Sequence, residues 1–532
     1  MRRCVSLLLI LCWATILRLW ALDFGLPHSL ARPDEGAVLA VAMRFFQGIG
    51  HPGFFDWPSL FMYAACAGYV VYFGIGRLAG WFSDATAFVA SASTHPGPLL
   101  LVARTLSAAC GVLTVWTTAR VGTIAFDRPT GTLAAFFLAG AALHVRDSHF
   151  GVTDVAATCL LMQSFFYTVR YDRDRSRRDA VLSAIWAGLA ASTKYNTGLV
   201  VLPGLWAIAT RRGRASSGGR LVASGGYGSL ALVAFVVGTP YAAIDAPTFL
   251  AALTGVFAHL RDGHGAMAGF GWIVHLRSSL WHGLGWPVLG MGLAGLVLAV
   301  AHKGRMGLLL TIFPVTYFAS IGAGQTGFAR YIIPSIPFLC LSAAHLVVEA
   351  ARASTRAIGR PGWAMPIAWS LATLAAAPSV SSAILTNRLL ARADSRLIAA
   401  TWIHEQVPAA TSIYQSGSVY GHVQLHTADP EGSDRVREVV YDEALGVFRH
   451  IGGAPAGLPE LLVIVECPLF YCDVPERIRA VAESQYVRRH EVTAFDASRT
   501  PVYDWDDAFF VPLAGFAGVT RPGPNLTIFV RR

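Results

Sequence analysis

Long apolar segments separated by short polar loops make up most of the chain before about residue 388. These segments lie near 4–22, 57–80, 98–122, 130–146, 154–170, 180–193, 197–210, 221–240, 283–301, 306–322, 331–350 and 363–386. Several approach the roughly 20 residues that an α-helix needs to cross the hydrocarbon core of a bilayer. The pattern predicts an α-helical polytopic membrane protein.

Basic residues in the loops between the segments predict which loops are cytoplasmic. They form groups at Arg170, Arg173, Arg175, Arg177 and Arg178; at Arg211, Arg212, Arg214 and Arg220; at Lys303 and Arg305; and at Arg352, Arg356 and Arg360. Cytoplasmic loops collect Lys and Arg, so we expect all of these groups on the side of Arg2 and Arg3.

Segment 57–80 is long enough to span the membrane, but the charge pattern argues against a span. If this segment crossed, the first two arginine groups would both lie outside. Trp57 and Trp81 flank it, and such aromatic residues suit the headgroup region. We therefore predict an interfacial or re-entrant helix at 57–80.

A single helix over 180–210 would bury Lys194 in mid-membrane, at a cost of roughly 2.5–3.5 kcal/mol on insertion scales. It would also separate the first two arginine groups. Two short helices joined by an outer turn at 193–196 avoid both problems, because broken helices are tolerated where they line a water-filled cavity. The resulting topology has about 11 transmembrane helices, a cytoplasmic N-terminus and an external C-terminus.

The composition changes near residue 388, where polar residues become common. We expect residues 1–387 to form a transmembrane domain, with interfacial helices in an outer loop at 23–97. Residues 388–532 are enough for a small extracytoplasmic α/β domain.

Apolar stretches within that last part predict its elements. We expect strands at 461–465, 486–495 and 526–530 and a helix at 475–484. Cys467 and Cys472 would lie in an oxidising compartment, where they either form a disulfide or stay as two buried thiols.

Composition agrees with a membrane protein and argues against other classes. Hydrophobic residues make up 54% of the chain and charged residues 14%, whereas soluble domains carry about 25% charged residues. The net charge is +10, but the basic residues lie in short loops, so we expect no nucleic-acid partner. No phosphate-binding Gly-rich loop, dinucleotide fingerprint or HExxH motif occurs, so no cofactor is predicted, and a divalent metal stays open.

Two adjacent carboxylates, Asp34 and Glu35, follow the first apolar segment. Glu35 onward predicts a short helix that ends at Gly48. One interpretation is an N-terminal capping pair, because the helix dipole favours negative charge there by roughly 0.3–1 kcal/mol. The alternative is a general base held at the outer membrane surface.

Asp154 opens the fifth apolar segment, where it either caps a helix or positions a polar substrate group. Arg146, Lys194, Arg261 and Arg330 are basic residues on the side where few are expected. Each is either a membrane anchor or part of a site for an anionic lipid headgroup, since arginine donates two parallel hydrogen bonds to phosphate.

Several motifs, in their order along the chain, resemble those of the protein O-mannosyltransferase and aminoarabinose transferase superfamily. These are class C glycosyltransferases that use polyprenyl-phosphate sugars. The matching stretches are Arg32-Pro33-Asp34-Glu35, 148–154, 188–195, Gly238-Thr239-Pro240-Tyr241, 329–334, 394–408 and 521–525.

This resemblance implies a bacterial inner-membrane enzyme that transfers a sugar, with inversion, from a polyprenyl-phosphate donor to a hydroxyl acceptor. The acceptor would be a protein, lipid or envelope glycan on the outer face. Asp34 would be the base, Glu35 its neighbour and Asp154 a further acidic residue of the site. The expected substrate-binding residues are Arg146, His149, Lys194, Tyr195, Tyr241, Arg330 and Tyr331.

Two other functions fit the same topology. A transporter or flippase of lipid-linked sugars would carry inverted repeats and polar groups in both halves of the membrane. No such repeat is evident, and the unusual polar residues gather on one predicted side. A ligase of envelope glycans is the second alternative.

Overall fold

The structure is a computed structural model that describes residues 2–210, 216–265, 270–425 and 436–532. Its residues group into two compact units, which we name the helical unit and the mixed unit. The helical unit contains Met1–Leu22, Ala37–Val71 and Val102–Ile384. The mixed unit contains Asp23–Gly36, Tyr72–Leu101 and Leu385–Arg532. The predicted basic residues Arg211, Arg212 and Arg214 lie outside the described residues.

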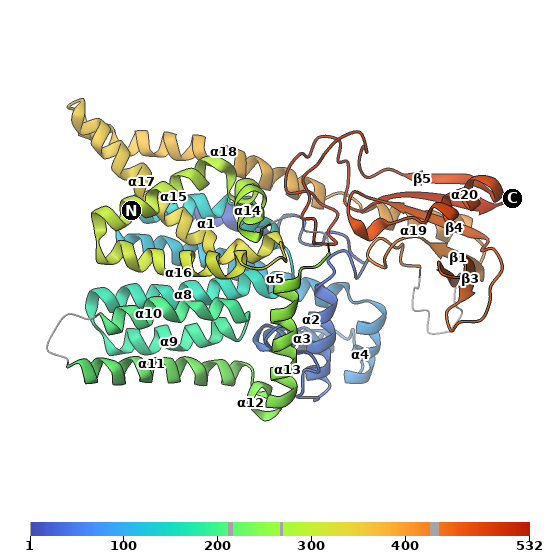
Figure 1. The fold of residues 1–532 in the computed structure, drawn as a ribbon, viewed down its shortest axis with the longest axis horizontal. Coiled ribbons are helices and arrows are strands. Elements are labelled where there is room, and N and C mark those ends of the chain that lie inside the picture. Colours follow the sequence, from blue (N-terminus) through green and yellow to red (C-terminus); the bar gives the residue numbers. More distant parts are fainter. Residues whose placement is uncertain (1, 211–215, 266–269, 426–435) are drawn as a thin grey trace. The chain divides into compact units, whose positions relative to one another are not determined.

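The helical unit is built from long helices that lie beside one another. Its main helices are α1 (Arg2–Leu19), α5 (Gly97–Ala125), α6 (Arg128–Ala139), α8 (Thr153–Asp174), α9 (Arg177–Ala191), α10 (Val201–Ala209), α11 (Ser217–Gly238), α15 (Trp286–Lys303), α16 (Arg305–Gly322), α17 (Ile336–Ala357) and α18 (Ala364–Leu390). Figure 1 shows α8, α9, α10 and α11 running alongside one another, whereas α13 (Ala246–Asp262) crosses their direction.

Seven helical segments in the described part of the chain are long and apolar enough to cross a membrane. They include α3 (Leu60–Leu78), the helix within the segment that we predict to be interfacial. The count of 11 spans, and the interfacial position of α3, therefore stay predictions. The membrane-protein architecture itself is clear from these apolar helices.

Small residues allow the helices to approach closely. A Cβ atom added at Gly295 in α15 would lie 2.0 Å from the carbonyl oxygen of Ser342 in α17. Close backbone approach increases van der Waals contact, which drives helix association in lipid, where the hydrophobic effect between helices is absent. Glycine is therefore required where α15 meets α17.

The chain breaks between α9 and α10, as the position of Lys194 predicts. α9 ends at Ala191, and a 3-10 helix, η1 (Tyr195–Val200), leads into α10. The Thr197 hydroxyl donates to the carbonyl oxygens of Ala190 and Lys194, at 2.8 and 2.7 Å. The same two carbonyl groups also accept from the backbone amides of Lys194 and Thr197, so the polar backbone at the break is hydrogen-bonded within the protein.

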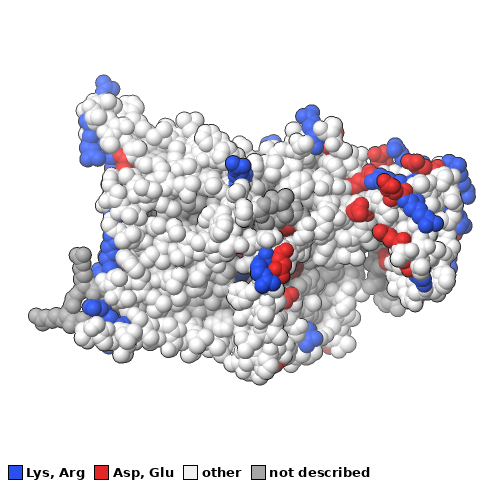
Figure 2. Space-filling model, in the orientation of Figure 1, with Lys and Arg blue, Asp and Glu red and all other residues white. Residues whose placement is uncertain are grey.

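Basic residues gather at one end of the helical unit, where several helix turns meet (Figure 2). Arg305 contacts Asp172 at 2.7 Å and donates to the carbonyl oxygen of Thr210 at 3.1 Å. Arg352 contacts Asp127 at 2.6 Å. Turns that the charge pattern assigns to one side of the membrane are thus neighbours in space.

A six-stranded sheet forms the centre of the mixed unit. Its strands are β1 (Thr411–Gln415), β2 (Val436–Asp442), β3 (Val447–His450), β4 (Leu461–Glu466), β5 (Tyr486–Val492) and β6 (Asn525–Arg531), in the order β3-β2-β1-β4-β6-β5. β1 pairs parallel with both β2 and β4, and the outer pairs are antiparallel.

Helices cover both faces of this sheet, so each face has its own apolar core. Along β4, Leu461, Val463 and Val465 pack on one face, together with Ala399 of α19 (Ser395–Gln406). Leu462 and Ile464 pack on the other face with α20 (Glu476–Gln485). Burial on both faces explains why β4 is a continuous apolar run rather than an alternating one.

The predicted elements of this C-terminal part are confirmed, with small shifts at their ends. β4, β5, β6 and α20 lie where the apolar stretches predict them. The sequence did not predict β1, β2 or β3, which are short or carry many exposed side chains. Cys467 and Cys472, for which two states were open, form a disulfide.

Cysteine labelling tests the interfacial position of α3. Asp56 and Ser83, which flank it, are both exposed. In a chain with the exposed Cys12 replaced by Ser, an impermeant maleimide added to intact spheroplasts should label Asp56→Cys and Ser83→Cys alike. Arg360→Cys, in a predicted cytoplasmic loop, should react only after permeabilisation. The prediction fails if Ser83→Cys also needs permeabilisation.

Candidate active site

The acidic motif belongs to the mixed unit, where a buried arginine connects it to the C-terminal part. Asp34 directly precedes α2 (Glu35–Phe46), and Arg32 Nη2 lies 3.2 Å from its Oδ2 atom. Arg32 Nη1 donates to Asp507 Oδ1 at 2.5 Å. The guanidinium group also lies over the ring of Phe509, at 5.6 Å from its centroid. Arg32 therefore bridges two carboxylates that are far apart in sequence.

The two adjacent carboxylates differ in accessibility. The Asp34 side chain is 23% exposed, whereas Glu35 is 1% exposed. A proton acceptor must reach its substrate, so exposure favours Asp34 over Glu35 as the base. Arg32 is fully buried, which means that its charge needs the carboxylates around it.

Further hydrogen bonds attach the loop before Asp34 to the same unit. His28 Nε2 donates to the carbonyl oxygen of His422 at 2.9 Å. Ser29 and Gln424 exchange two hydrogen bonds, at 2.9 and 2.8 Å. Burial, together with the charge of Arg396, lowers the pKa of His28 to about 3, so this ring is neutral at ordinary pH.

A second buried ion pair supports this loop. Arg396 donates from Nε and Nη2 to the two carboxylate oxygens of Asp394, at 2.9 and 2.7 Å. Burial would raise the pKa of Asp394, but Arg396 outweighs it and holds the pKa below its ordinary value. Arg396 Nη1 also donates to the carbonyl oxygens of Tyr420 and Leu30. The 394–408 motif thus contacts the first loop directly.

Four predicted site residues meet in the helical unit. Lys194 Nζ donates to Asp154 Oδ1, and it lies 4.5 Å from the centroid of the Tyr331 ring. Arg330 lies over the Phe328 ring at 3.9 Å and is 7% exposed. The loop between α9 and η1 presents Lys194, and η3 (Ala329–Ser335) presents Arg330 and Tyr331. Two cations and several aromatic rings therefore share one region.

The loop at 51–60 is attached to the same part of the helical unit. The amide of Leu60 donates to the carbonyl oxygen of Ser192 at 3.1 Å, and the hydroxyls of Ser192 and Thr239 are 2.7 Å apart. The Tyr195 hydroxyl donates to the carbonyl oxygen of Phe55 at 2.8 Å. Stretches around 56–60, 192–195 and 238–241 are thus neighbours.

Tyr241 contacts the same loop. Its ring packs edge to face against His51, with centroids 4.8 Å apart. His51 in turn lies 3.1 Å from Asp245. Tyr241 therefore helps to hold the 51–60 loop against α12 (Tyr241–Ile244).

Arg146 and His149 are buried among protein groups. Arg146 forms an ion pair with Asp147 at 3.1 Å. The two ring nitrogens of His149 each lie 2.9 Å from a carbonyl oxygen, of Val145 and of Trp20. These contacts hold the 144–149 turn in place against the end of α1.

Sequence reasoning missed Arg18 and Asp507. Arg18 is fully buried, donates to carbonyl oxygens at the end of α6 and contacts His144 at 2.9 Å. A lone arginine in an apolar segment was the available signal. For Asp507, the signal was three aspartates, at 504, 506 and 507, inside a mainly apolar stretch. Among the described residues, no group of three or more His, Cys, Asp or Glu is placed to hold a metal ion.

The fold and the site define a polytopic membrane protein with acidic and cationic groups and an α/β domain. Residues 85–243 match the family described as dolichyl-phosphate-mannose-protein mannosyltransferase. A search of curated protein sequences found no match.

Solved structures share this fold over nearly the whole chain. One is ArnT from Cupriavidus metallidurans bound to undecaprenyl phosphate, with 15% identity, a TM-score of 0.55, and coverage of 98% of this chain and 97% of that one. Another is the oligosaccharyltransferase AglB from Archaeoglobus fulgidus with an inhibitory peptide and a dolichol-phosphate: 12% identity, TM-score 0.53, coverage 100% and 88%. The expected class C glycosyltransferase fold is confirmed.

A double-mutant cycle tests the bridge between Arg32 and Asp507. Arg32→Gln and Asp507→Asn should each destabilise the mixed unit, and the double variant should lose less than the sum. We expect a coupling energy above about 1 kcal/mol, because both partners are buried. Pulse proteolysis in urea measures it.

The exposed pair Arg499–Asp496 is the matched control, for which we expect a coupling near zero. Additive effects at Arg32 and Asp507 would contradict the bridge.

Proposed function

We propose that this protein transfers a sugar, with inversion, from a polyprenyl-phosphate donor to a hydroxyl group on the outer face of a bacterial inner membrane. The observation that carries the proposal is the cationic and aromatic group around Lys194 and Arg330. It lies in a chain that shares its fold, end to end, with a protein bound to undecaprenyl phosphate.

In this proposal, Lys194 and Arg330 bind the donor phosphate. Their side chains are mostly buried, so their charges act in a low-dielectric region where electrostatic interactions are strong. Asp154 is a positioning residue here, because its ion pair fixes the amino group of Lys194. Tyr331 supplies a ring face to Lys194 and stabilises the ammonium group.

The proposed reaction is a single displacement. The acceptor hydroxyl oxygen forms a bond to the anomeric carbon as the bond from that carbon to the phosphate oxygen breaks. Asp34 takes the hydroxyl proton, and polyprenyl phosphate leaves as an anion. Preorganised cations stabilise the charge that develops on the leaving group, so the phosphate needs no proton.

Arg32 takes a positioning role in this scheme. It contacts Asp34 and is itself fixed by Asp507, so the carboxylate is held in one orientation before the acceptor arrives. Glu35 is buried at the start of α2 and supports the loop rather than taking the proton.

The other expected binding residues do not contact the phosphate in this proposal. They position the segments around Lys194 and Arg330. Tyr195 and Tyr241 hold the 51–60 loop, which we propose as one wall of the substrate site. Arg146 and His149 fix the turn that leads into Asp154.

A reconstitution experiment separates this function from transport. Purified protein in liposomes receives a radiolabelled polyprenyl-phosphate sugar and a native envelope fraction. A glycosyltransferase forms a labelled product, whereas a flippase moves the lipid across the bilayer without forming one. Transport with no product would overturn the proposal.

Arg330→Ala should weaken binding of undecaprenyl phosphate by more than tenfold, because a hydrogen bond to a charged group contributes roughly 1.5–3 kcal/mol. Fluorescence titration in nanodiscs measures the affinity. Arg360→Ala, an exposed arginine in a predicted cytoplasmic loop, should bind like the native chain. Equal affinities of Arg330→Ala and the native chain would exclude Arg330 from the phosphate site.

Asp34→Asn keeps the side-chain size but removes the base, so sugar transfer should fall by roughly 100-fold or more. Donor affinity should change little, whereas the melting temperature should fall, because Asp34 helps to compensate the buried charge of Arg32. Glu35→Gln should also impair transfer, and the exposed Asp496→Asn should not. If Asp34→Asn transferred sugar at the native rate, Asp34 would not be the base, and the motif would have a structural role only.

A further inference from the structure

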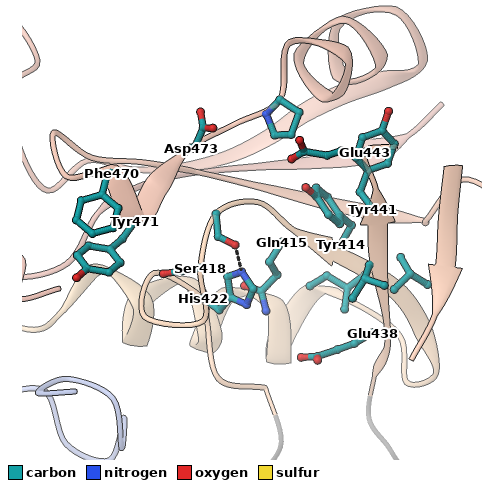
Figure 3. Close-up of a pocket in the computed structure, with 15 residues that line it drawn as sticks. Tyr414, Gln415, Ser418, His422, Glu438, Tyr441, Glu443, Phe470, Tyr471 and Asp473 are labelled. Atoms are coloured by element: carbon teal, nitrogen blue, oxygen red, sulfur yellow. Dashed lines mark hydrogen bonds between the residues drawn. The ribbon is translucent and has the colours of Figure 1, made fainter. Parts of the chain in front are cut away.

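The C-terminal sheet carries a cavity of about 470 Å³ that the proposed reaction does not use. Its walls come from the carboxyl ends of the parallel strands β1 and β2 and from the loop after β4 (Figure 3). The chain leaves β1 to form β2 on one side and later β4 on the other. Ligands of α/β sheets bind at such a point, where the strand order reverses. The volume lies within the roughly 300–1,000 Å³ of known ligand sites.

Two pairs of aromatic rings stand on opposite sides of this cavity. Figure 3 shows Phe470 and Tyr471 on one side and Tyr414 and Tyr441 on the other. The centroids within the pairs are 4.0 and 6.4 Å apart. Tyr414 and Tyr471 are anchored in the two apolar cores of the sheet, whereas Phe470 is 48% exposed. The cavity therefore has rigid ring faces that an apolar sugar face can stack on.

The loop between the rings is fixed by backbone geometry. Gly417 has a φ of +76°, and a Cβ atom there would lie 2.8 Å from the carbonyl oxygen of Tyr471. That carbonyl accepts from the amide of Ser418 at 2.8 Å. Among the described residues, the buried hydroxyl of Ser418 has no hydrogen-bond partner, although it lines the cavity. A buried polar atom of this kind favours a ligand that supplies the missing bond.

The charged groups that the described residues place on the walls are acidic. Glu438, Glu443 and Asp473 line the cavity, and no Lys or Arg of the described residues does. His422 also faces it and donates to the carbonyl oxygen of Gly417 at 3.2 Å. Carboxylates accept hydrogen bonds from hydroxyl and ammonium groups and repel phosphate. The walls therefore suit a neutral or amino sugar and exclude the phosphate end of the donor.

The cavity is coupled to the acidic motif within the same unit. The carbonyl oxygen of His422 accepts from His28, and Gln424 bonds to Ser29, both in the loop that carries Asp34. A ligand in the cavity is thus separated from that loop by one short stretch of chain.

We propose that this cavity binds a neutral or amino sugar of the acceptor, so that the acceptor is a glycan. Naming the bound sugar as part of the acceptor rests on the proposed transferase function. The sugar-binding site itself is argued from the contacts around the cavity. Stacking on Phe470 and hydrogen bonds to Glu443 and Asp473 carry the recognition.

Saturation-transfer NMR on the full-length protein in nanodiscs tests the site. The probes are N-acetylglucosamine, glucosamine, mannose, arabinose and glucose 1-phosphate. At least one neutral or amino sugar should bind, glucosamine should bind more tightly than N-acetylglucosamine, and glucose 1-phosphate should not bind. Phe470→Ala should weaken sugar binding by about five- to tenfold. Glu443→Gln should abolish the preference for glucosamine.

Matched controls keep the result specific. The exposed Ile451→Ala and Glu483→Gln lie outside the cavity lining and should bind sugar normally. All four variants should retain native affinity for undecaprenyl phosphate, which reports a folded chain.

The outcomes separate the site from the transferase function. The site is overturned if no sugar in the set binds, if Phe470→Ala and Glu443→Gln bind as the native chain does, or if a basic peptide binds more tightly than every sugar. Asp34→Asn should still bind sugar. If it binds sugar but transfers at the native rate, the proposed mechanism fails while the site stands.

Discussion

The mixed unit depends on the need to compensate one buried charge. Arg32 is fully buried, and removing a charged group from water costs several kcal/mol unless opposite charges surround it. Asp34 and Asp507 supply that compensation from opposite ends of the sequence.

 Asp34 is two residues from Arg32, whereas Asp507 is 475 residues away. The charge requirement therefore joins the first loop to the C-terminal part, and the ion pair of Asp394 with Arg396 adds a second connection of the same kind.

The helical unit meets a related constraint, because polar groups inside an apolar bundle need partners within the protein. At the break after α9, Thr197 donates to two backbone carbonyl groups, and Lys194 contacts Asp154. Arg18 satisfies carbonyl groups at the end of α6 in the same way. The polar residues that interrupt the apolar pattern are thus the residues that fix the candidate site.

Patterns with a local cause were predictable from the sequence. The short helix from Glu35, the break near Lys194 and strand β4 follow from hydrophobic period and charge within a few residues. The partner of Arg32 was not predictable, because no local pattern indicates a contact across 475 residues. Strands β1 and β2 were missed for a different reason: β1 is short, β2 carries exposed side chains, and their pairing partners are set by tertiary contacts that their own sequences do not encode.

The pairing of Lys194 with Asp154 also bears on how a phosphate would bind. The pair is formally neutral, so an arriving phosphate must compete with Asp154 for the ammonium group, and Arg330 lies over the rings of Phe328 and Tyr331. A cation that already has a carboxylate partner is fixed in place before the phosphate arrives, and the reorganisation needed when charge develops on the leaving group is smaller. The same partner limits how tightly the free phosphate is held after transfer. In the proposed reaction, Asp154 thus favours the release of polyprenyl phosphate as well as the orientation of Lys194.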